Sequence, residues 1–504
     1  MNRTTPSPDR RLSPFAVWFA AIFLALLLVG RERMFRDPGT LWHTVVGERM
    51  LDTRQVIRTD PFSFTCEGRP WIAQQWLAEC LMALLHRAAS LDGLLLGAAA
   101  LLAAAYASIA ARLMARGAGP AGAAIVVALV VGASSFHFHA RPHVFTIAFA
   151  AWTFGALCDV ESGRAASRRL WLLPLVLALW TNLHGGALGG VLTILLALAG
   201  WIAVMRLTSP RSARGFPVLV AVGAAVVAAV LVNPFGLELP RVWLALMNSR
   251  VLPAIMQEHG PLEPGSPEAW MIFALAALYV GVLFDSRRVM LRVTWLLPLV
   301  WLVLAVSRIR HAPIFAVLAA VAVAEMLPCS ALLTVLRDRR SLFAASGVGS
   351  SPPRAGRWAA PALVLLVLAV QTLGWRLPLI GAGWARLSPD YWPVEAVQQL
   401  AEAAPRTARP RVFNQMSYGG YLIYALPRAQ VYIDDRCELY GDGFLKAYDA
   451  LMRHPAGFDA EASRWNFDFA IVSSRSRLAE HLRANRAWRV VHRDDTATLF
   501  QPQN

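Results

Sequence analysis

Charged residues are scarce in this sequence. They make up 16% of the 504 residues, whereas an ordinary soluble domain carries about 25%. Hydrophobic residues reach 57%, and the mean hydropathy is +0.47. Apolar runs of about 20 residues, the length that spans a bilayer as a helix, recur along the chain. The composition therefore excludes an ordinary soluble protein and predicts a polytopic α-helical membrane protein.

Cysteine and the familiar catalytic motifs are also scarce. The five cysteines do not suggest a disulfide framework; free thiols are the favoured interpretation, with a Cys66–Cys80 bridge as the alternative. The chain contains no Walker loop and no GxSxG, HExxH or CxxC pattern, and we find no internal repeat. The function must therefore be sought in residues that the fold brings together, and not in one contiguous motif.

The net charge of +16 at first suggests nucleic acid as a partner. We reject that interpretation, because most of the arginines lie in short loops between apolar runs, where they set membrane topology. We expect about eleven spans, near residues 14–30, 93–113, 120–137, 143–159, 169–183, 187–205, 216–233, 267–285, 291–306, 311–327 and 358–376. The segment Trp71–Leu85 carries Gln74, Gln75 and Glu79, and we interpret it as an interfacial helix and not as a span.

Alternate loops differ sharply in arginine content. One set contains Arg112, Arg116, Arg164, Arg168, Arg169, Arg206, Arg211, Arg214, Arg287, Arg288, Arg292, Arg337, Arg339, Arg340, Arg354 and Arg357. The other set contains only Arg141, Arg241, Arg250, Arg308 and Arg310. Positive loops stay in the cytoplasm, so we expect the N-terminus inside and residues 31–92 and 377–504 outside. The chain is thus predicted to be a multi-pass protein of the bacterial cytoplasmic membrane.

The composition changes along the chain after the expected membrane domain, residues 1–376. Within that domain, Ser341–Arg357 is rich in Gly, Ser and Pro and predicts a flexible cytoplasmic linker. Residues 377–504 predict a small periplasmic α/β domain. Its helices are expected at Pro393–Ala404 and Phe444–Met452, and its strands at Arg411–Asn414, Gln430–Asp434, Phe467–Ser473, Arg489–His492 and Thr496–Phe500.

Polar side chains gather at the loops assigned to the outer face, which also hold most of the 11 histidines. The set comprises Asp37, His43, Glu48, Asp60, Gln75, Trp76, Glu79, His137, His139, Arg141, His143, Asn182, His184, Asn233, Glu258, His259, Arg308, Arg310 and His311. Topology requires only Arg or Lys, and polar groups near membrane depth usually line a cavity or pair with one another. The pattern indicates an outward-facing cavity in which a carboxylate accepts a proton while arginines hold a leaving phosphate.

Several stretches resemble a known superfamily over nearly the whole chain. They are RDPGTLWHTVVGERML, TDPFSFTCEGRPWIAQQWLAE, ARPHVF, TNLHGG, VNPFG and VFNQMSYGGYLIYALPRAQVYIDDRCELYGD. They are similar to a group of bacterial glycosyltransferase-like membrane proteins, and more distantly to the GT-C superfamily, which includes the protein O-mannosyltransferases and aminoarabinose transferases. The resemblance implies a polyprenyl-phosphate sugar donor and inverting transfer to a glycan, lipid or protein hydroxyl.

The resemblance implies that Asp37, an acidic residue early in the first outer loop, acts as the catalytic base or activates the acceptor. The alternative is that Asp37, in the turn-forming tripeptide DPG, caps the following helix. Asp60 and Glu79 are weaker catalytic candidates, with turn and surface-charge alternatives. Many superfamily members carry a second acid beside the first; here Asp37 is followed by Pro38, so the sequence gives no support to a divalent metal site.

Arginines at outer helix ends run against the topology bias. We expect Arg141, Arg308 and Arg310, with His184, to bind the donor phosphate; the alternative for the arginines is snorkelling to the interface. We expect seven residues to line the substrate cavity: Trp42, His43, Gln75, Trp76, His139, Asn182 and Asn233. Trp42 could instead anchor the interface, and TNLHGG could be a simple turn in which Asn182 and His184 cap helices.

Two other functions stay open at this point. One is a non-enzymatic carrier or assembly partner in envelope polysaccharide export, and the other is an inactive GT-C-like protein that binds glycolipid. A carrier needs a polar path across the membrane, whereas the stretches Leu94–Ala111 and Pro217–Leu231 have almost no polar residue. The acidic stretch YIDDRCELYG, in the C-terminal domain, is interpreted as an ordinary loop rather than an acceptor contact.

Overall fold

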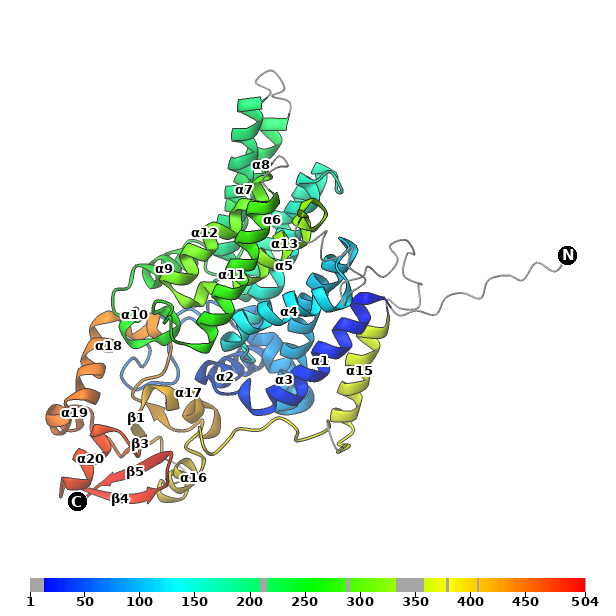
Figure 1. Cartoon of the computed structure of the whole chain (residues 1–504). Helices are drawn as coiled ribbons and strands as arrows, with labels where there is room; N and C mark the ends of the chain where they lie inside the picture. The colour runs from blue at the N-terminus through cyan, green and yellow to red at the C-terminus, as the bar shows by residue number, and fades with distance from the viewer. Residues whose placement is uncertain are drawn as a thin grey trace.

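The computed structural model describes residues 13–208, 215–286, 291–331, 358–377, 380–405 and 408–503. The linker expected at 341–357 lies outside these ranges. A bundle of long helices is joined to a smaller region that contains a twisted sheet, and the sheet lies beside one end of the bundle (Figure 1). We call that end the domain end, and the opposite end, which carries Arg112 and Glu325, the far end.

Seven described helical segments are long and apolar enough to cross a membrane. They are α1 (Pro14–Arg33), α3 (Trp76–Ala115), α4 with η1 (Pro120–His137), α5 (His143–Glu161), α7 (Ala187–Thr208), α11 (Pro267–Ser286) and α13 with its flanking turns (Ile309–Cys329). Shorter apolar helices are α8 (Phe216–Ala229), α12 (Val293–Ser307) and α15 (Ala359–Thr372). A polytopic helical membrane protein is thus confirmed, whereas the expected number of about eleven spans is not.

The helix at the centre of the bundle is α13 (Ala312–Met326). All its residues are buried, and it packs against α3, α4, α5, α11 and α12. A helix that is apolar all round is stable only when it is surrounded on every side. Its sequence therefore explains its central position, and it places Arg310 and His311 at one end and Glu325 at the other.

The first long loop forms the floor of the domain end. It contains α2 (Pro38–Thr53), which Asp37 caps, and α2 packs against the first half of α3. Gly47 allows the backbones of α2 and α3 to approach closely, because a Cβ there would overlap the Glu79 carbonyl. The helix α3 is interrupted at Ala89 and Ser90, where the φ of Ser90 is 54°. The predicted Trp71–Leu85 helix therefore begins at Trp76 and is separated by this break from the membrane part of α3.

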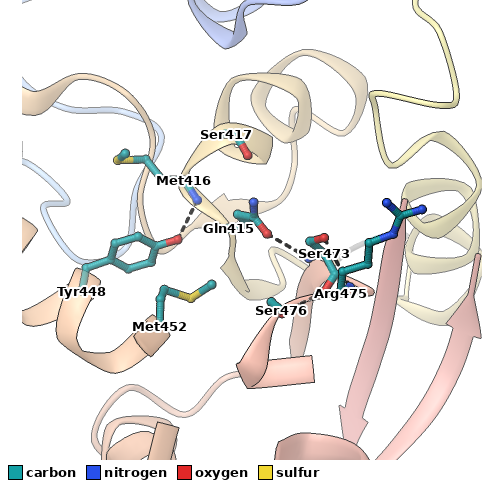
Figure 2. A pocket seen from close by; sticks show the side chains of 8 residues that line it. All are labelled: Gln415, Met416, Ser417, Tyr448, Met452, Ser473, Arg475 and Ser476. Atoms are coloured by element: carbon teal, nitrogen blue, oxygen red, sulfur yellow. Dashed lines mark hydrogen bonds between the residues drawn. The ribbon is translucent and has the colours of Figure 1, made fainter. Parts of the chain in front are cut away.

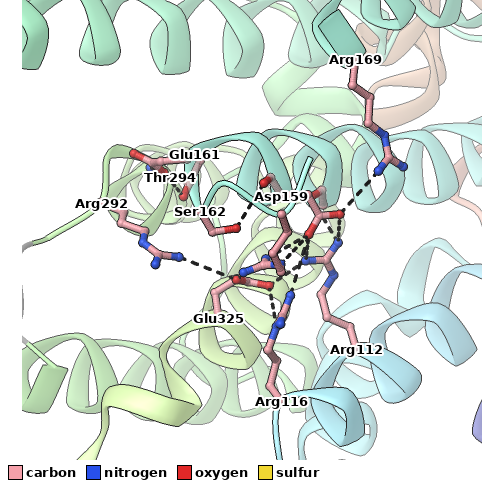
Figure 3. Close-up of polar contacts among 11 residues, drawn as sticks. Arg112, Arg116, Asp159, Glu161, Ser162, Arg169, Arg292, Thr294 and Glu325 are labelled. Carbon is pink, nitrogen blue, oxygen red and sulfur yellow. Dashed lines mark hydrogen bonds and ion pairs between the residues drawn. The ribbon is translucent and has the colours of Figure 1, made fainter. Parts of the chain in front are cut away.

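A group of ion pairs ties helices together at the far end (Figure 3). Glu325 of α13 pairs with Arg112 and Arg116 of α3, and Asp159 of α5 accepts two hydrogen bonds from Arg112, at 3.1 and 3.0 Å. Further guanidinium groups from Arg164, Arg169 and Arg292 lie within ion-pair distance of these two acids. We call these seven residues the far-end cluster.

The C-terminal region contains a five-stranded sheet in the order β2-β1-β3-β5-β4. The strands are β1 (Arg411–Asn414), β2 (Gln430–Val431), β3 (Phe469–Ser473), β4 (Trp488–Arg493) and β5 (Ala497–Pro502). The first three are parallel, and β5 runs antiparallel to β3 and β4. All five predicted strands are found; β2 and β3 are shorter than predicted, and β4 and β5 end later.

Helices surround this sheet. They are α16 (Val394–Ala403), α17 (Met416–Ala425), α18 (Cys437–Arg453), α19 (Phe458–Trp465) and α20 (Arg477–Ala484). The two predicted helices correspond to α16 and to part of α18. Three short helices, α17, α19 and α20, were not predicted, because each is at most three turns long and depends on the sheet for its stability.

The C-terminal region is held on the first loop by backbone hydrogen bonds and by a buried ion pair. Val431 of β2 exchanges backbone hydrogen bonds with Phe62 and Phe64, at 3.1 and 3.2 Å, so the loop covers that edge of the sheet. Arg436 pairs with Asp60 of the loop at 2.8 Å, and α17 packs on α2. A Cβ on Gly420 of α17 would overlap the backbone of Pro38. The sheet region is therefore held against the start of α2, next to Asp37.

Candidate functional site

Asp37 lies at the junction of the bundle and the C-terminal region. Its Oδ1 accepts a hydrogen bond from the Gly39 amide at 2.7 Å, and its Oδ2 accepts one from Arg141 Nη1 at 2.8 Å. Asp37 thus caps α2, as one of its two sequence-based interpretations predicts, and it also faces an arginine; its catalytic role stays a prediction. Burial alone would raise the pKa of this carboxyl, but the charges of Arg141 and His139 outweigh burial and lower it. Asp37 is therefore a fixed negative charge.

Arg141 is held rigidly in the turn between η1 and α5. The Ala140 amide donates to the Met34 carbonyl at 2.9 Å, which ties this turn to the end of α1. The guanidinium lies directly over Gly39, where any Cβ would come within 2.6 Å of Arg141 Nε. Gly39 therefore makes room for the contact between Asp37 and Arg141, which explains the glycine in RDPGT.

A second carboxylate near Asp37, that of Asp435, belongs to the C-terminal region. Trp42 of α2 donates from Nε1 to Asp435 Oδ1 at 2.7 Å. Burial raises the pKa of Asp435 to about 7; Arg141 opposes this shift, and Asp37 adds to it. Two neighbouring acids therefore differ in charge state near neutral pH, an arrangement typical of acid–base chemistry. Asp435 lies in YIDDRCELYG, which was predicted to be an ordinary loop, so this residue was missed. Two adjacent acids shortly after a buried strand were the available signal.

A third carboxylate, Glu258, lies between two arginines. Its Oε1 is 3.9 Å from Arg310 Nη1, and Arg310 also contacts the ring of His259. Burial would raise the pKa of Glu258, but Arg310 and then Arg141 lower it, so both arginines act on the same carboxylate. Arg308 differs from its neighbour: it donates to the Met247 carbonyl at 2.9 Å and does not join this group.

Three histidine rings lie close to one another, near the two arginines. The ring of His143 lies 6.2 Å from that of His139 and 6.3 Å from that of His184, measured between centroids. His184 Nδ1 accepts from the Gly186 amide at 3.0 Å, so its proton is on Nε2. Burial and the neighbouring His143 lower the pKa of His184 well below its usual value. His184 is therefore a neutral hydrogen-bond donor and not a cation.

Some buried polar atoms of this end have no partner. They are His43 Nε2, Glu79 Oε2, His137 Nε2 and His139 Nδ1 among the described residues. His43 and Glu79, each 1% exposed, hydrogen-bond to each other at 2.7 Å through their other atoms. Burial and then Arg141 lower the pKa of His43, which favours its neutral form. Glu79 is thus a buried, paired acid and not a surface charge. Unpartnered buried polar atoms usually mark a place where a ligand or water binds.

Other predicted site residues have structural partners. Asp60 is fully buried, pairs with Arg436 and accepts from the Phe62 and Ser63 amides, both at 3.1 Å. Asn233 caps the NPFG turn by accepting from the Phe235 amide at 2.7 Å. Asn182 accepts from Trp76 Nε1 at 2.7 Å, and Gln75 makes no capping hydrogen bond at the start of α3.

We call the converging residues the domain-end cluster: Asp37, His43, Glu79, His137, His139, Arg141, His143, His184, Glu258, Arg310 and Asp435. Among the described residues, the three side chains with metal-ligand spacing are Glu395, His492 and Asp494, which belong to the C-terminal region and not to this cluster. All five cysteines are free thiols, so the alternative Cys66–Cys80 bridge is not formed. The domain-end cluster therefore consists of arginines, carboxylates and imidazoles.

No family model matches the chain, and no curated protein matches it in sequence. Solved structures do match its fold. ArnT from Cupriavidus metallidurans, bound to undecaprenyl phosphate, aligns with a TM-score of 0.51 and 15% identity, over 97% of this chain and 98% of that one. The arabinofuranosyltransferase AftD from Mycobacteria aligns with a TM-score of 0.53 and 16% identity, over 99% of this chain and 42% of that one. The fold that the resemblance implied is thus confirmed, because the chain shares its overall architecture with ArnT and AftD.

Proposed function

We propose that the chain is a membrane glycosyltransferase that moves a sugar from a polyprenyl-phosphate donor to an envelope acceptor hydroxyl. The observation that carries this proposal is the domain-end cluster, in which Arg141 and Arg310 lie beside three of the four carboxylates and near several unpartnered imidazole atoms. The cluster lies in a fold shared with ArnT, whose crystal structure holds undecaprenyl phosphate. Arginines suit a phosphate leaving group, and a carboxylate suits the activation of a hydroxyl.

The acids have different charge states and therefore different roles in the proposed reaction. Asp435, whose pKa is about 7, takes the proton of the acceptor hydroxyl as the oxygen attacks the anomeric carbon. The bond between that carbon and the phosphate oxygen breaks, and polyprenyl phosphate leaves with the electron pair. Asp37 stays charged, fixes Arg141 and orients the acceptor. One displacement inverts the configuration of the sugar.

The leaving phosphate is stabilised by Arg141, Arg310 and His184. The two guanidinium groups provide positive charge, and the Nε2–H of neutral His184 provides a hydrogen bond without a competing proton equilibrium. Because Asp37 and Glu258 hold the arginines in place beforehand, little reorganisation is needed as charge develops on the phosphate. Arg308 is not assigned a role in this step, since it caps the end of α9 (Glu238–Asn248).

The reaction is placed on the extracytoplasmic face, with the N-terminus inside. The arginines of the far-end cluster support this orientation, because positive loops remain in the cytoplasm. Lipid-linked sugars are the activated donors expected on the outer face of a bacterial cytoplasmic membrane. The buried, apolar α13 between the two clusters argues against a carrier, which needs a polar path from one end to the other.

The substitution Asp37→Asn tests this proposal. Asn can still accept the cap hydrogen bond from the Gly39 amide, so α2 should keep its start. The charge that holds Arg141 is lost, and we expect transfer of a radiolabelled sugar from polyprenyl phosphate in membrane vesicles to fall by about 10²-fold or more. A fully active, well-folded Asp37→Asn protein would refute the role of Asp37.

A further inference from the structure

A cavity lies in the C-terminal region, apart from the domain-end cluster. It has a volume of about 440 Å³ and is formed by Gln415, Met416, Ser417, Tyr448, Met452, Ser473, Arg475 and Ser476 (Figure 2). Three of these residues follow β1 directly, and three lie at or just after the end of β3. The cavity therefore opens at the carboxyl ends of two adjacent parallel strands.

The position of this cavity in the topology is informative. After β1 the chain passes through α17 to β2, on one side of β1; after β3 it passes through α20 to the antiparallel strands on the other side. The connections thus diverge between β1 and β3. In open α/β sheets, ligands bind in the crevice that such a divergence leaves.

The walls of the cavity are held in place without a ligand. Gln415 Oε1 accepts from the Ser473 amide at 2.9 Å, which joins the ends of the two strands (Figure 2). The Met416 amide donates to Tyr448 Oη at 2.8 Å, which fixes the aromatic ring of α18 against the start of α17. Burial raises the pKa of Tyr448, so its hydroxyl stays protonated and keeps a proton to donate to a ligand.

The lining combines apolar faces with few polar groups. Met416, Met452 and Tyr448 form the apolar part of the lining, and the side chains of Ser417, Ser473 and Ser476 form part of its polar side. Such a combination of apolar walls and sparse polar groups is typical of small-ligand sites.

One arginine, Arg475, lines this cavity, and two others lie close to it in the chain. Arg475 is exposed and forms no ion pair with any described residue, and in Figure 2 its guanidinium extends outward on the side opposite Tyr448. Arg477 donates to the Arg453 carbonyl, next to Met452, and Arg483 donates to the Ser474 carbonyl, next to Ser473. The unpaired charge of Arg475 favours a ligand that carries negative charge.

One helix connects this cavity with the domain-end cluster. Met416, in the cavity wall, begins α17, and Gly420 of the same helix packs on the backbone of Pro38, next to Asp37. Four residues of helix advance by about 6 Å. A molecule in the cavity would therefore lie roughly one helical turn of α17 away from the start of α2.

We propose that this cavity binds a sugar residue that carries a carboxylate or phosphate, as part of an anionic envelope glycan. This deepens the proposed function and rests on it in one respect: the glycan would be the acceptor, held by a residue other than the one that receives the new sugar. The binding itself requires no transfer, so it can be tested alone.

The test is saturation-transfer difference NMR on the full-length protein in detergent, with glucuronic acid, glucose 6-phosphate and glucose as probes. Glucuronic acid and glucose 6-phosphate should bind, and glucose should bind more weakly. Ser417→Trp, which fills the cavity, should abolish binding. Arg475→Ala should weaken it roughly tenfold, because a charge-assisted hydrogen bond is lost. Arg489→Ala, an exposed arginine on β4 outside the cavity, is the matched control and should bind as the wild type does.

Three results would overturn the inference. They are no binding of either charged sugar, equal binding to wild type and to folded Ser417→Trp protein, and equal affinity for glucose and glucuronic acid. If Ser417→Trp does not fold, the comparison of Arg475→Ala with Arg489→Ala decides, and equal affinities overturn the proposal. Binding of the charged sugars in a protein that transfers no sugar would instead count against the proposed function alone.

Discussion

The two ends of the helical bundle both bring arginines together with buried acids, yet they differ in how fully those acids are paired. In the far-end cluster, both oxygens of Asp159 and both oxygens of Glu325 contact guanidinium groups (Figure 3). In the domain-end cluster, Asp435 has only a tryptophan as its side-chain partner, and imidazole atoms of His43, His137 and His139 have none. The carboxylate oxygens of the far-end cluster thus all have partners, whereas several polar atoms of the domain-end cluster can still bind a ligand.

This difference separates a structural role from a chemical one. Acids with all their partners in place stabilise a fold but have no capacity left for a substrate. Acids and imidazoles that lack partners cost stability, and they are kept where a ligand completes them. The contrast is sharpest in Asp435, since burial without an ion pair holds its pKa near 7, at a value suited to proton transfer.

The largest effect is expected from Asp435→Asn. Asn preserves the size of the side chain and the hydrogen bond from Trp42, but it cannot accept a proton. We expect transfer to fall by about 10²–10⁴-fold, the usual contribution of a general base. In the wild type, activity should decline as the pH falls through about 7, because Asp435 becomes protonated there. The residual activity of Asp435→Asn should not show this decline at low pH, as measured by initial rates between pH 5 and pH 9.

The same substitution should not reduce stability. The folded-state pKa of Asp435 is raised, so the folded protein binds this proton more tightly than the unfolded chain and loses stability as the pH rises from the unfolded-state value toward about 7. Asp435→Asn removes this loss and should melt at the same or a higher temperature at pH 8. A protein that is inactive because it melts much earlier would contradict the assignment.

A large effect of the opposite kind is expected from Glu325→Gln at the far end. It leaves several arginines without their buried partner, and loss of one member of a buried pair typically costs about 3–5 kcal/mol. Thermal unfolding in detergent should show the loss, with Glu263→Gln, an exposed acid, as the control. Transfer per folded molecule should stay unchanged; a catalytic defect without destabilisation would break the distinction between the two ends.

A smaller effect separates two neighbouring arginines. Arg310→Gln should raise the KM for the lipid-linked donor roughly tenfold, because a charge-assisted contact with phosphate is lost. Arg308→Gln should leave the KM unchanged, since Arg308 is bound to the Met247 carbonyl. Equal effects of the two substitutions would mean that general positive charge, and not the geometry around Glu258, attracts the donor.

The parts of this picture that depend on local pattern were accessible from the sequence. Apolar runs predicted the helical membrane protein, and short alternating segments predicted the strands of the C-terminal sheet. The alternation of arginine-rich loops placed Asp37, Arg141 and Arg310 at one end, because successive helices return to the same side. Their convergence therefore follows from topology.

The missed features depend on contacts between distant segments. Asp435 joins the site only through Trp42, 393 residues earlier in the chain, and no local pattern encodes that docking. Asp60, like Asp37, stands directly before a proline, but its partner, Arg436, is 376 residues away in the chain. The difference between Arg308 and Arg310 depends on how α9 ends, which spacing alone does not determine.

The central claim is that the domain-end cluster binds a polyprenyl phosphate. Native mass spectrometry of the protein purified in a mild detergent tests this claim most directly, with the wild type compared with Arg141→Gln and with the control Arg308→Gln. We predict a bound species with the mass of a polyprenyl phosphate in the wild type and in Arg308→Gln, and its loss in Arg141→Gln. Absence of that species from the wild type, or its undiminished presence in folded Arg141→Gln protein, would contradict the account.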